Sequence, residues 1–87
     1  MMLHKFNGSE TSLSNTTANT VSLAPVVRIL NPTAGAIKVT QNDPVANAVT
    51  ATFSLNTLTE LTIVKKPTDT LVANASGLLV TPASFIY

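Results

Sequence analysis

The chain contains few side chains that can carry out chemistry. It has no cysteine, a single histidine at position 4, and five lysine and arginine residues against four aspartate and glutamate residues in 87 positions. General acid–base catalysis needs a titratable group poised near neutral pH, and His4 lies in a polar terminus where Glu10 is the nearest carboxylate in sequence. We therefore expect no enzymatic activity, no cofactor and no small-molecule substrate.

Basic and aromatic side chains are also scarce. The formal net charge is +1, aromatic residues make up 5% of the chain, and the longest basic run is the pair Lys65-Lys66. Proteins that bind nucleic acid usually carry a basic stripe with interleaved aromatic residues, because neutralisation of phosphates supplies most of their affinity. We expect no direct contact with nucleic acid.

Long apolar runs are missing as well. No stretch approaches the roughly 18 consecutive apolar residues of a membrane-spanning helix, and Met1 to Gly8 lacks the apolar region of a secretory signal. The sequence predicts no contact with a membrane, and the retained Met1 favours a protein that stays in the cytoplasm where it is made.

What the chain does contain is threonine, asparagine and serine, which fill a third of its positions between short apolar runs. We divide it into a polar N-terminal arm, residues 1–20, and a body, residues 21–87. A domain of this size hides only roughly 60% of the surface of its unfolded chain and is marginally stable. Without cysteine, and with few metal-type residues, oligomerisation is the remaining support, so we expect a homo-oligomer or a subunit docked on a larger surface.

The arm has too little apolar surface to offset its ordering entropy by itself. Its composition is compatible with a disordered tail. The interpretation we favour is an arm ordered by other subunits, with Leu3, Phe6 and Leu13 as its apolar anchors.

The body alternates between short β-branched runs and turn clusters. From Val21 onward, where Val21 and Leu23 already alternate with Ser22, this pattern predicts an all-β fold, a small antiparallel β-sandwich or barrel with an extended N-terminal arm. The clearest alternation places Val49, Ala51, Phe53 and Leu55 on one face, with Phe53 in the core. The expected strands lie near residues 26–30, 37–40, 49–55, 61–64, 70–73, 78–81 and 83–87, the last two separated by Pro82.

Three polar residues in turn-rich stretches, Asn42, Asp43 and Asp69, could contribute oxygen ligands to a metal ion. Calcium requires six to eight oxygens, usually from several carboxylates, and the whole chain has four acidic residues. We favour the alternative that these residues stabilise turns through side-chain to backbone hydrogen bonds, and we expect no metal site.

Two further features have an intrachain and an intersubunit interpretation. Arg28 is the only arginine and lies within an apolar run, so it either pairs with Glu60 or Asp69 or reaches a neighbouring subunit. Phe85, Ile86 and Tyr87 form either a closing strand or a contact between subunits.

Three segments resemble small virion proteins of tailed phages, particularly those of marine bacteria and cyanobacteria. They are Thr20 to Asn31 (TVSLAPVVRILN), Lys65 to Leu71 (KKPTDTL) and Val80 to Ala83 (VTPA). The resemblance implies a β-sandwich structural protein in the virion, assembled in the host cytoplasm, and it favours a decoration (cement) protein that bridges major capsid subunits. The alternatives are a neck, tail or fibre component, or a cytoplasmic module that binds a partner by strand addition. The candidate partner-binding residues are Leu3, Phe6, Leu13, Arg28, Phe85 and Tyr87.

Overall fold

The computed structural model describes residues 3–6 and 8–86, with side chains described for residue 6 and residues 8–84. Within these ranges the chain forms strands and no helix, which confirms the predicted all-β class. The strands are β1 (Leu3–Phe6), β2 (Thr11–Ser12), β3 (Val26–Asn31), β4 (Ile37–Asp43), β5 (Ala48–Leu55), β6 (Thr59–Val64), β7 (Thr70–Ala73) and β8 (Leu79–Ile86).

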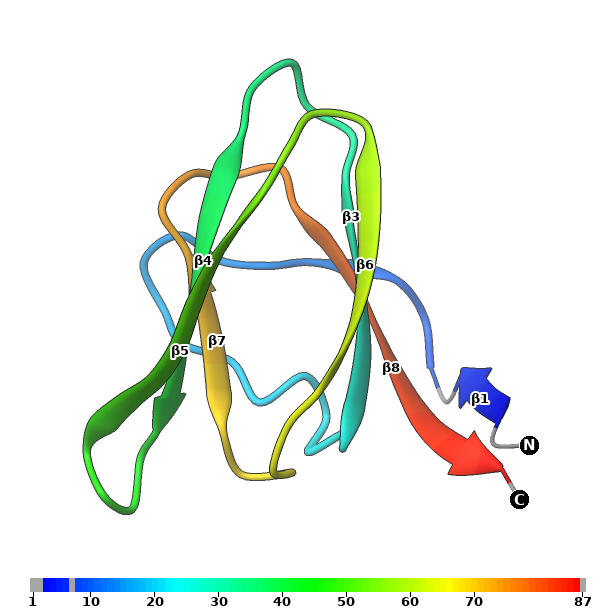
Figure 1. Cartoon of the computed structure of the whole chain (residues 1–87), viewed down its shortest axis with the longest axis vertical. Coiled ribbons are helices and arrows are strands. Elements are labelled where there is room, and N and C mark those ends of the chain that lie inside the picture. The colour runs from blue at the N-terminus through cyan, green and yellow to red at the C-terminus, as the bar shows by residue number, and fades with distance from the viewer. Residues whose placement is uncertain (1–2, 7, 87) are drawn as a thin grey trace.

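Two antiparallel sheets face each other (Figure 1). The larger sheet has the order β1-β8-β3-β6, and β2 pairs with β8 beside β1. The smaller sheet has the order β5-β4-β7. This arrangement is compatible with the small antiparallel β-sandwich that the alternating pattern predicts.

The core lies between the sheets because alternate residues of each strand point inward. The larger sheet contributes Val27, Ile29 and Val80, and the smaller sheet contributes Val39 and Leu71; all five are fully buried. Branched apolar side chains at these alternating positions fit a pleated surface that is buried on one face. At these five positions the core follows the alternation of residues along the strands.

The expectation that Pro82 separates two strands is wrong, because β8 runs through it. Proline has no backbone N–H to donate to a neighbouring strand, so a strand tolerates it only where that hydrogen bond is not needed. Pro82 falls between the part of β8 that pairs with β2 and the part that pairs with β1. Gly8 lies against this interruption, and a Cβ there would stand 2.9 Å from Cγ of Pro82.

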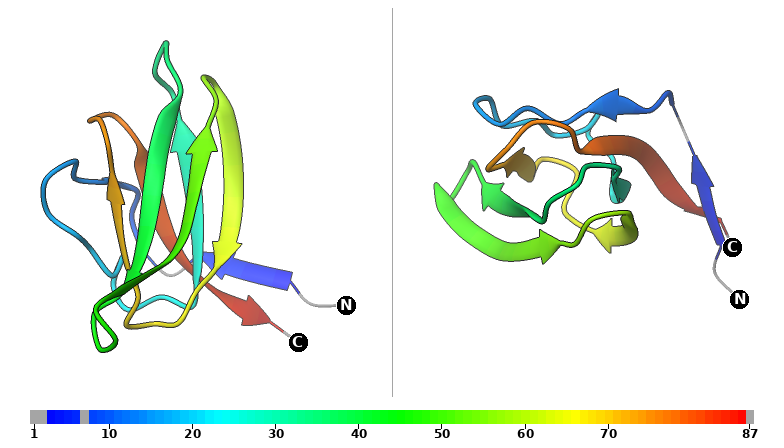
Figure 2. Two further views of the ribbon diagram at one scale, coloured as in Figure 1. Left: turned by 60° about the vertical axis from the view of Figure 1, so that its left-hand side comes forward. Right: turned by 90° about the horizontal axis from the view of Figure 1, so that it is seen from above.

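The N-terminal segment crosses from one sheet to the other. After β2, Leu13 donates its N–H to Leu78 O at 2.8 Å, and the chain then runs along the edge of β7 as far as Asn19. Figure 2 shows this blue segment on the side of the molecule opposite β5 and β6. One side of the sandwich is thus closed by the chain itself.

Residues Val21 to Leu23, which we expected to begin a strand, form a left-handed turn. Their φ angles are 55°, 57° and 55°. Oδ1 of Asn19 accepts the N–H of Val21 at 2.8 Å, and Oγ1 of Thr20 accepts the N–H of Leu23 at 3.3 Å. These side-chain acceptors compete with strand pairing, and an alternation of three residues is too short to reveal them.

The face predicted for β5 is correct only in part. Leu55 is buried and Phe53 is half-buried against the core, whereas Ala51 is exposed. Ala51 pairs with Gln41 while Val49 pairs with Asn42, so Thr50 is an extra residue in a β-bulge. The bulge turns Val49 to the outer face, where it is 61% exposed. A strict alternation of residue types cannot signal such a bulge.

Candidate interaction surface

Strands β7 and β8 are each covered on one side by the N-terminal part of the chain. β1 and β2 lie along β8. The N-terminal segment lies along β7, where Asn19 and Leu71 exchange hydrogen bonds of 3.0 and 2.8 Å and Ala73 N–H donates to Ser14 O at 3.1 Å. Backbone N–H and C=O groups along the covered sides of β7 and β8 therefore have partners.

The edges of β5 and β6, like the outer sides of the short strands β1 and β2, have no partner among the described residues. Strands β5 and β6 are joined by the turn at residues 56–58 and diverge from it toward the opposite end of the molecule (Figure 1). We call this part of the surface the open side; it consists of β5, β6 and the turns at residues 44–47 and 56–58. Unpaired edge strands are templates for pairing with another chain.

Exposed apolar side chains gather on the open side. Among the described residues, five of the seven exposed large apolar side chains belong to it. Single exposed apolar residues are ordinary on protein surfaces, so these five are candidate contact residues because they lie on or next to strands with unpaired edges. The five residues are Val45, Val49, Leu58, Leu61 and Val64.

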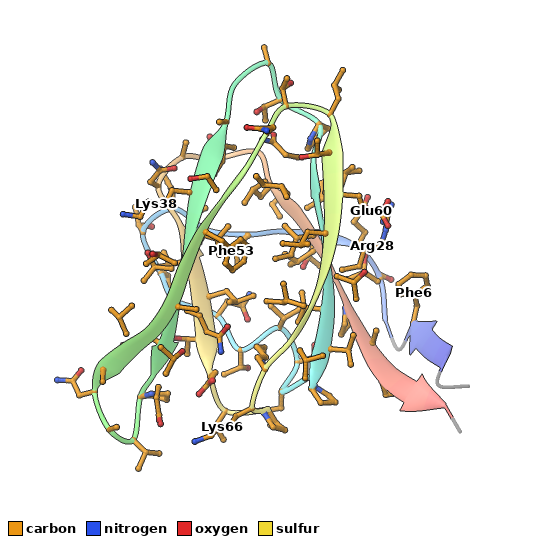
Figure 3. The ribbon with its side chains drawn as sticks, in the orientation of Figure 1. Phe6, Arg28, Lys38, Phe53, Glu60 and Lys66 are labelled. Atoms are coloured by element: carbon orange, nitrogen blue, oxygen red, sulfur yellow. The ribbon has the colours of Figure 1, made fainter. Side chains whose placement is uncertain are left out.

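The two free edges differ in chemistry. β5 reads Ala-Val-Thr-Ala-Thr-Phe-Ser-Leu and contains no charge, proline or glycine. β6 carries Glu60, and Lys66 follows soon after its end with an exposed side chain (Figure 3). Since charged side chains on or near an edge discourage pairing, β5 is the less protected of the two.

Arg28 is held within the chain by two carboxylates. Its guanidinium donates to Oε2 of Glu60 at 2.8 Å and to Oε2 of Glu10 at 3.3 Å, so the predicted intrachain pair with Glu60 is present. The hydrogen bond with Glu60 raises the pKa of Arg28, and the same bond lowers the pKa of Glu60. The cluster lies on the outer face of the larger sheet (Figure 3) and ties the N-terminal segment to β3 and β6.

The apolar residues predicted as partner contacts lie in different environments. Leu13 is 1% exposed and packs in the core of its own chain, so its side chain is buried without any other subunit. Phe6 is 58% exposed on β1, so its role as a partner contact stays a prediction. The backbone of Phe85 belongs to β8, the predicted closing strand, but its side chain, that of Leu3 and all of Tyr87 lie outside the described residues.

The polar residues considered as metal ligands serve the fold in two ways. Oδ1 of Asp43 accepts the N–H groups of Val45 and Ala46 at 3.0 and 3.3 Å, which confirms its predicted role in a turn. Asp69 is buried, and its Oδ2 accepts from Nε2 of Gln41 at 2.8 Å. No group of three or more histidine, cysteine or acidic side chains that could hold a metal occurs within the described ranges.

Lys65 is buried beside Asp69. Its Nζ donates to the carbonyl oxygens of Lys66 at 3.3 Å and Pro67 at 3.2 Å. Burial lowers the pKa of Lys65, and the negative charge of Asp69 opposes this effect. Oδ1 of Asp69 has no hydrogen-bond partner among the residues that the structure describes. The arrangement holds the turn between β6 and β7 through its own backbone.

A polar depression of about 370 Å³ lies beside the N-terminal segment. Hydroxyl and amide groups contribute to its lining, and none of the described residues that line it carries a charged side chain. The lining residues are Gly8, Ser9, Thr11, Ser12, Asn19, Val21, Ser22 and Pro82.

Comparison with protein-family models, with curated proteins and with solved structures gives no significant match to this chain. No helix in the described part of the chain has the length and hydropathy to cross a membrane.

Proposed function

We propose that the chain is a non-enzymatic structural protein of a virion, where it serves as a capsid decoration protein that bridges neighbouring major capsid subunits. The observation that carries the proposal is the open side. Among the described residues, its two unpaired strand edges lie beside five of the seven exposed large apolar side chains. Such a surface suits contact with protein.

The remaining chemistry of the described residues supports a structural role. The most strongly interacting charges, Arg28 with Glu10 and Glu60, are used in an intrachain cluster. Lys65 and Asp69 are buried and hold a turn. These groups stabilise the fold, and none of them faces the polar depression.

The kind of assembly is supported by the sequence resemblance to small virion proteins of tailed phages. In that setting, each copy adds a modest buried area between capsid subunits, and many copies together resist the internal pressure of packaged DNA. The partners are then the major capsid protein or other virion subunits.

A neck, tail or fibre position in the same particle fits the open side equally well. Copy number per particle distinguishes these positions from the capsid decoration position. A cytoplasmic binding module is the second candidate, and the free edge of β5 is the observation that favours it, because such edges accept strands from partner proteins.

The test is quantitative mass spectrometry of purified particles, with the major capsid protein as the internal reference. A decoration protein is expected in copies comparable in number with the major capsid protein. A copy number that corresponds to a single ring would replace the capsid position by a neck or tail position. Absence of the chain from washed, intact particles would overturn the virion role.

A further inference from the structure

The edge of β5 has the properties of a strand that pairs with itself. We propose that β5 of one copy pairs antiparallel with β5 of a second copy about a two-fold axis at Phe53, which joins the two three-stranded sheets into one. The inference rests on the proposed assembly role of the open side and adds the element and the partner.

The first argument is that β5 is left unprotected. Soluble proteins blunt free edges with charge, proline, a bulge or a very short strand. β5 has eight residues without charge or proline, and its one protective feature is the bulge at Thr50. The bulge leaves the stretch from Ala51 to Leu55 regular, so it limits the length of the pairing and does not prevent it.

The second argument is the match between the two copies. In antiparallel pairing, residues directly opposite each other lie on the same face of the sheet. With Phe53 opposite Phe53 of the second copy, Thr52 lies opposite Ser54 on the outer face. Ala51 lies opposite Leu55 on the inner face. Hydroxyl groups thus meet hydroxyl groups, and small apolar side chains meet large ones.

The third argument is the gradient of burial along β5. Leu55 is buried, Phe53 is half-buried, and Ala51 is exposed. Antiparallel pairing brings the exposed end of each strand beside the buried end of the other, so each copy covers what the other leaves open. Phe53, which points between the sheets (Figure 3), would gain an aromatic neighbour across the axis.

The flanks of the strand agree with this direction. Val49 is 61% exposed beyond the bulge, and Leu58 is 78% exposed in the turn at the other end. Antiparallel pairing places the Val49 end of one copy next to the Leu58 turn of the second copy. Lys38 is the charged residue of β4 beside this stretch, and it lies opposite Ser54 within its own chain. Across the proposed dimer, Ser54 lies opposite Thr52 of the second copy, which in turn lies opposite Thr40 of that copy. No like charges are brought together.

The edge of β6 fits a second copy less well. Glu60 lies on it and is engaged with Arg28, and the strand leads into Lys65 and Lys66. Val64 is nevertheless 64% exposed there, comparable with Val49 on β5. Val64 is therefore an exposed position on the edge of β6 at which a lysine substitution can serve as the control.

The first experiment measures self-association of the full chain by sedimentation equilibrium over a range of concentrations. The wild type and Val64→Lys are expected to dimerise, whereas Thr52→Lys is expected to remain monomeric. Because Thr52 is exposed, the melting temperature of Thr52→Lys should equal that of the wild type at protein concentrations low enough for the wild type to be monomeric, and should fall below it where the wild type is dimeric. A monomeric wild type, a dimeric Thr52→Lys or a monomeric Val64→Lys would overturn the proposal.

The second experiment fixes the register and does not depend on an added charge. The chain has no cysteine, so Thr52→Cys and Ser54→Cys variants each carry one thiol. On mixing and mild oxidation, the disulfide between the two variants is expected in excess over the two symmetric disulfides, because residues 52 and 54 lie opposite each other. Symmetric disulfides in excess, or none at all, would overturn pairing about Phe53.

The two proposals fail in different ways. A monomeric chain that is abundant on purified particles would overturn self-pairing and leave the virion role intact. A chain that dimerises through β5 but is absent from particles would support self-pairing and overturn the virion role.

Discussion

At the scale of single residues, Asn31 shows what a pattern of residue types leaves out. Asn31-Pro32 marks the end of a strand in the sequence, and β3 does end there. The structure adds that Asn31 is fully buried and that its Nδ2 donates to Gly35 O at 2.9 Å and to Leu55 O at 2.8 Å. Its side chain thus links the two sheets, a contact between residues far apart in sequence that no local signal reveals.

Asn31→Asp should therefore destabilise the chain. The substitution removes both N–H donors and turns a carboxylate toward two carbonyl oxygens, at a cost of about 1 to 3 kcal/mol for each buried group left unpaired. Asn56→Asp, at an exposed turn position, should change the free energy of unfolding by less than about 0.5 kcal/mol. Urea unfolding compares the two; equal effects would show that the Asn31 contacts contribute little.

Gly77 offers a second residue-scale test. Its φ is 113°, and a Cβ would lie 2.5 Å from Cγ2 of Thr33. Gly77→Ala should lower stability by about 1 to 3 kcal/mol through backbone strain. Gly35→Ala is the control, because nothing lies within 4 Å of a Cβ there, and it should be neutral or stabilising by up to about 1 kcal/mol. Equal melting temperatures for the two variants would contradict the geometry at Gly77.

Lys65 should give the stability an alkaline dependence. Burial lowers its pKa in the folded chain below the unfolded value, so between these two pKa values the unfolded chain binds more protons and stability rises with pH. Lys65→Met should flatten this rise. Urea unfolding at several pH values from about pH 7 to about pH 10 measures it, and an identical slope in the variant would refute the role of Lys65.

At the scale of elements, the sequence predicts the strands of the body well. β3, β4, β5, β6 and β7 lie where β-branched runs alternate with polar residues, and turn clusters separate them. The misses have two physical origins. The bulge in β5 and the continuation through Pro82 depend on pairing with other strands, which residue periodicity does not encode. The left-handed turn at Val21 depends on the side-chain acceptors of Asn19 and Thr20, which a three-residue alternation does not reveal.

The N-terminal segment is the element whose role changes most. Composition marks residues 1–20 as a polar arm, yet β2 and Leu13 belong to the body. Leu13→Ala should cost about 2 to 5 kcal/mol by leaving a cavity, whereas Phe6→Ala, at an exposed position, should cost less than about 0.5 kcal/mol. Urea unfolding tests the pair. A Leu13→Ala protein as stable as the wild type would contradict the burial of Leu13 and would favour the predicted contact with other subunits.

At the scale of the whole molecule, the chain closes one side of its sandwich and leaves the other open. The N-terminal segment covers the edges of β7 and β8, whereas β5 and β6 remain unpaired. The sequence predicts that this small domain needs support from other subunits, because it lacks cysteine and other covalent links. Which side provides the contact could not be predicted, since it depends on the order of strands in the sheets.

The most direct test of this account is residue-resolved amide hydrogen exchange, comparing the dilute free chain with the chain bound to purified particles. If the open side makes the contact, amides of β5 between Ala51 and Leu55 that exchange rapidly in the free chain become protected in the assembled state, while the protection of β7 and of residues 11–19 stays the same. Protection that appears along the N-terminal segment, with β5 and β6 exchanging as in the free chain, would contradict the account.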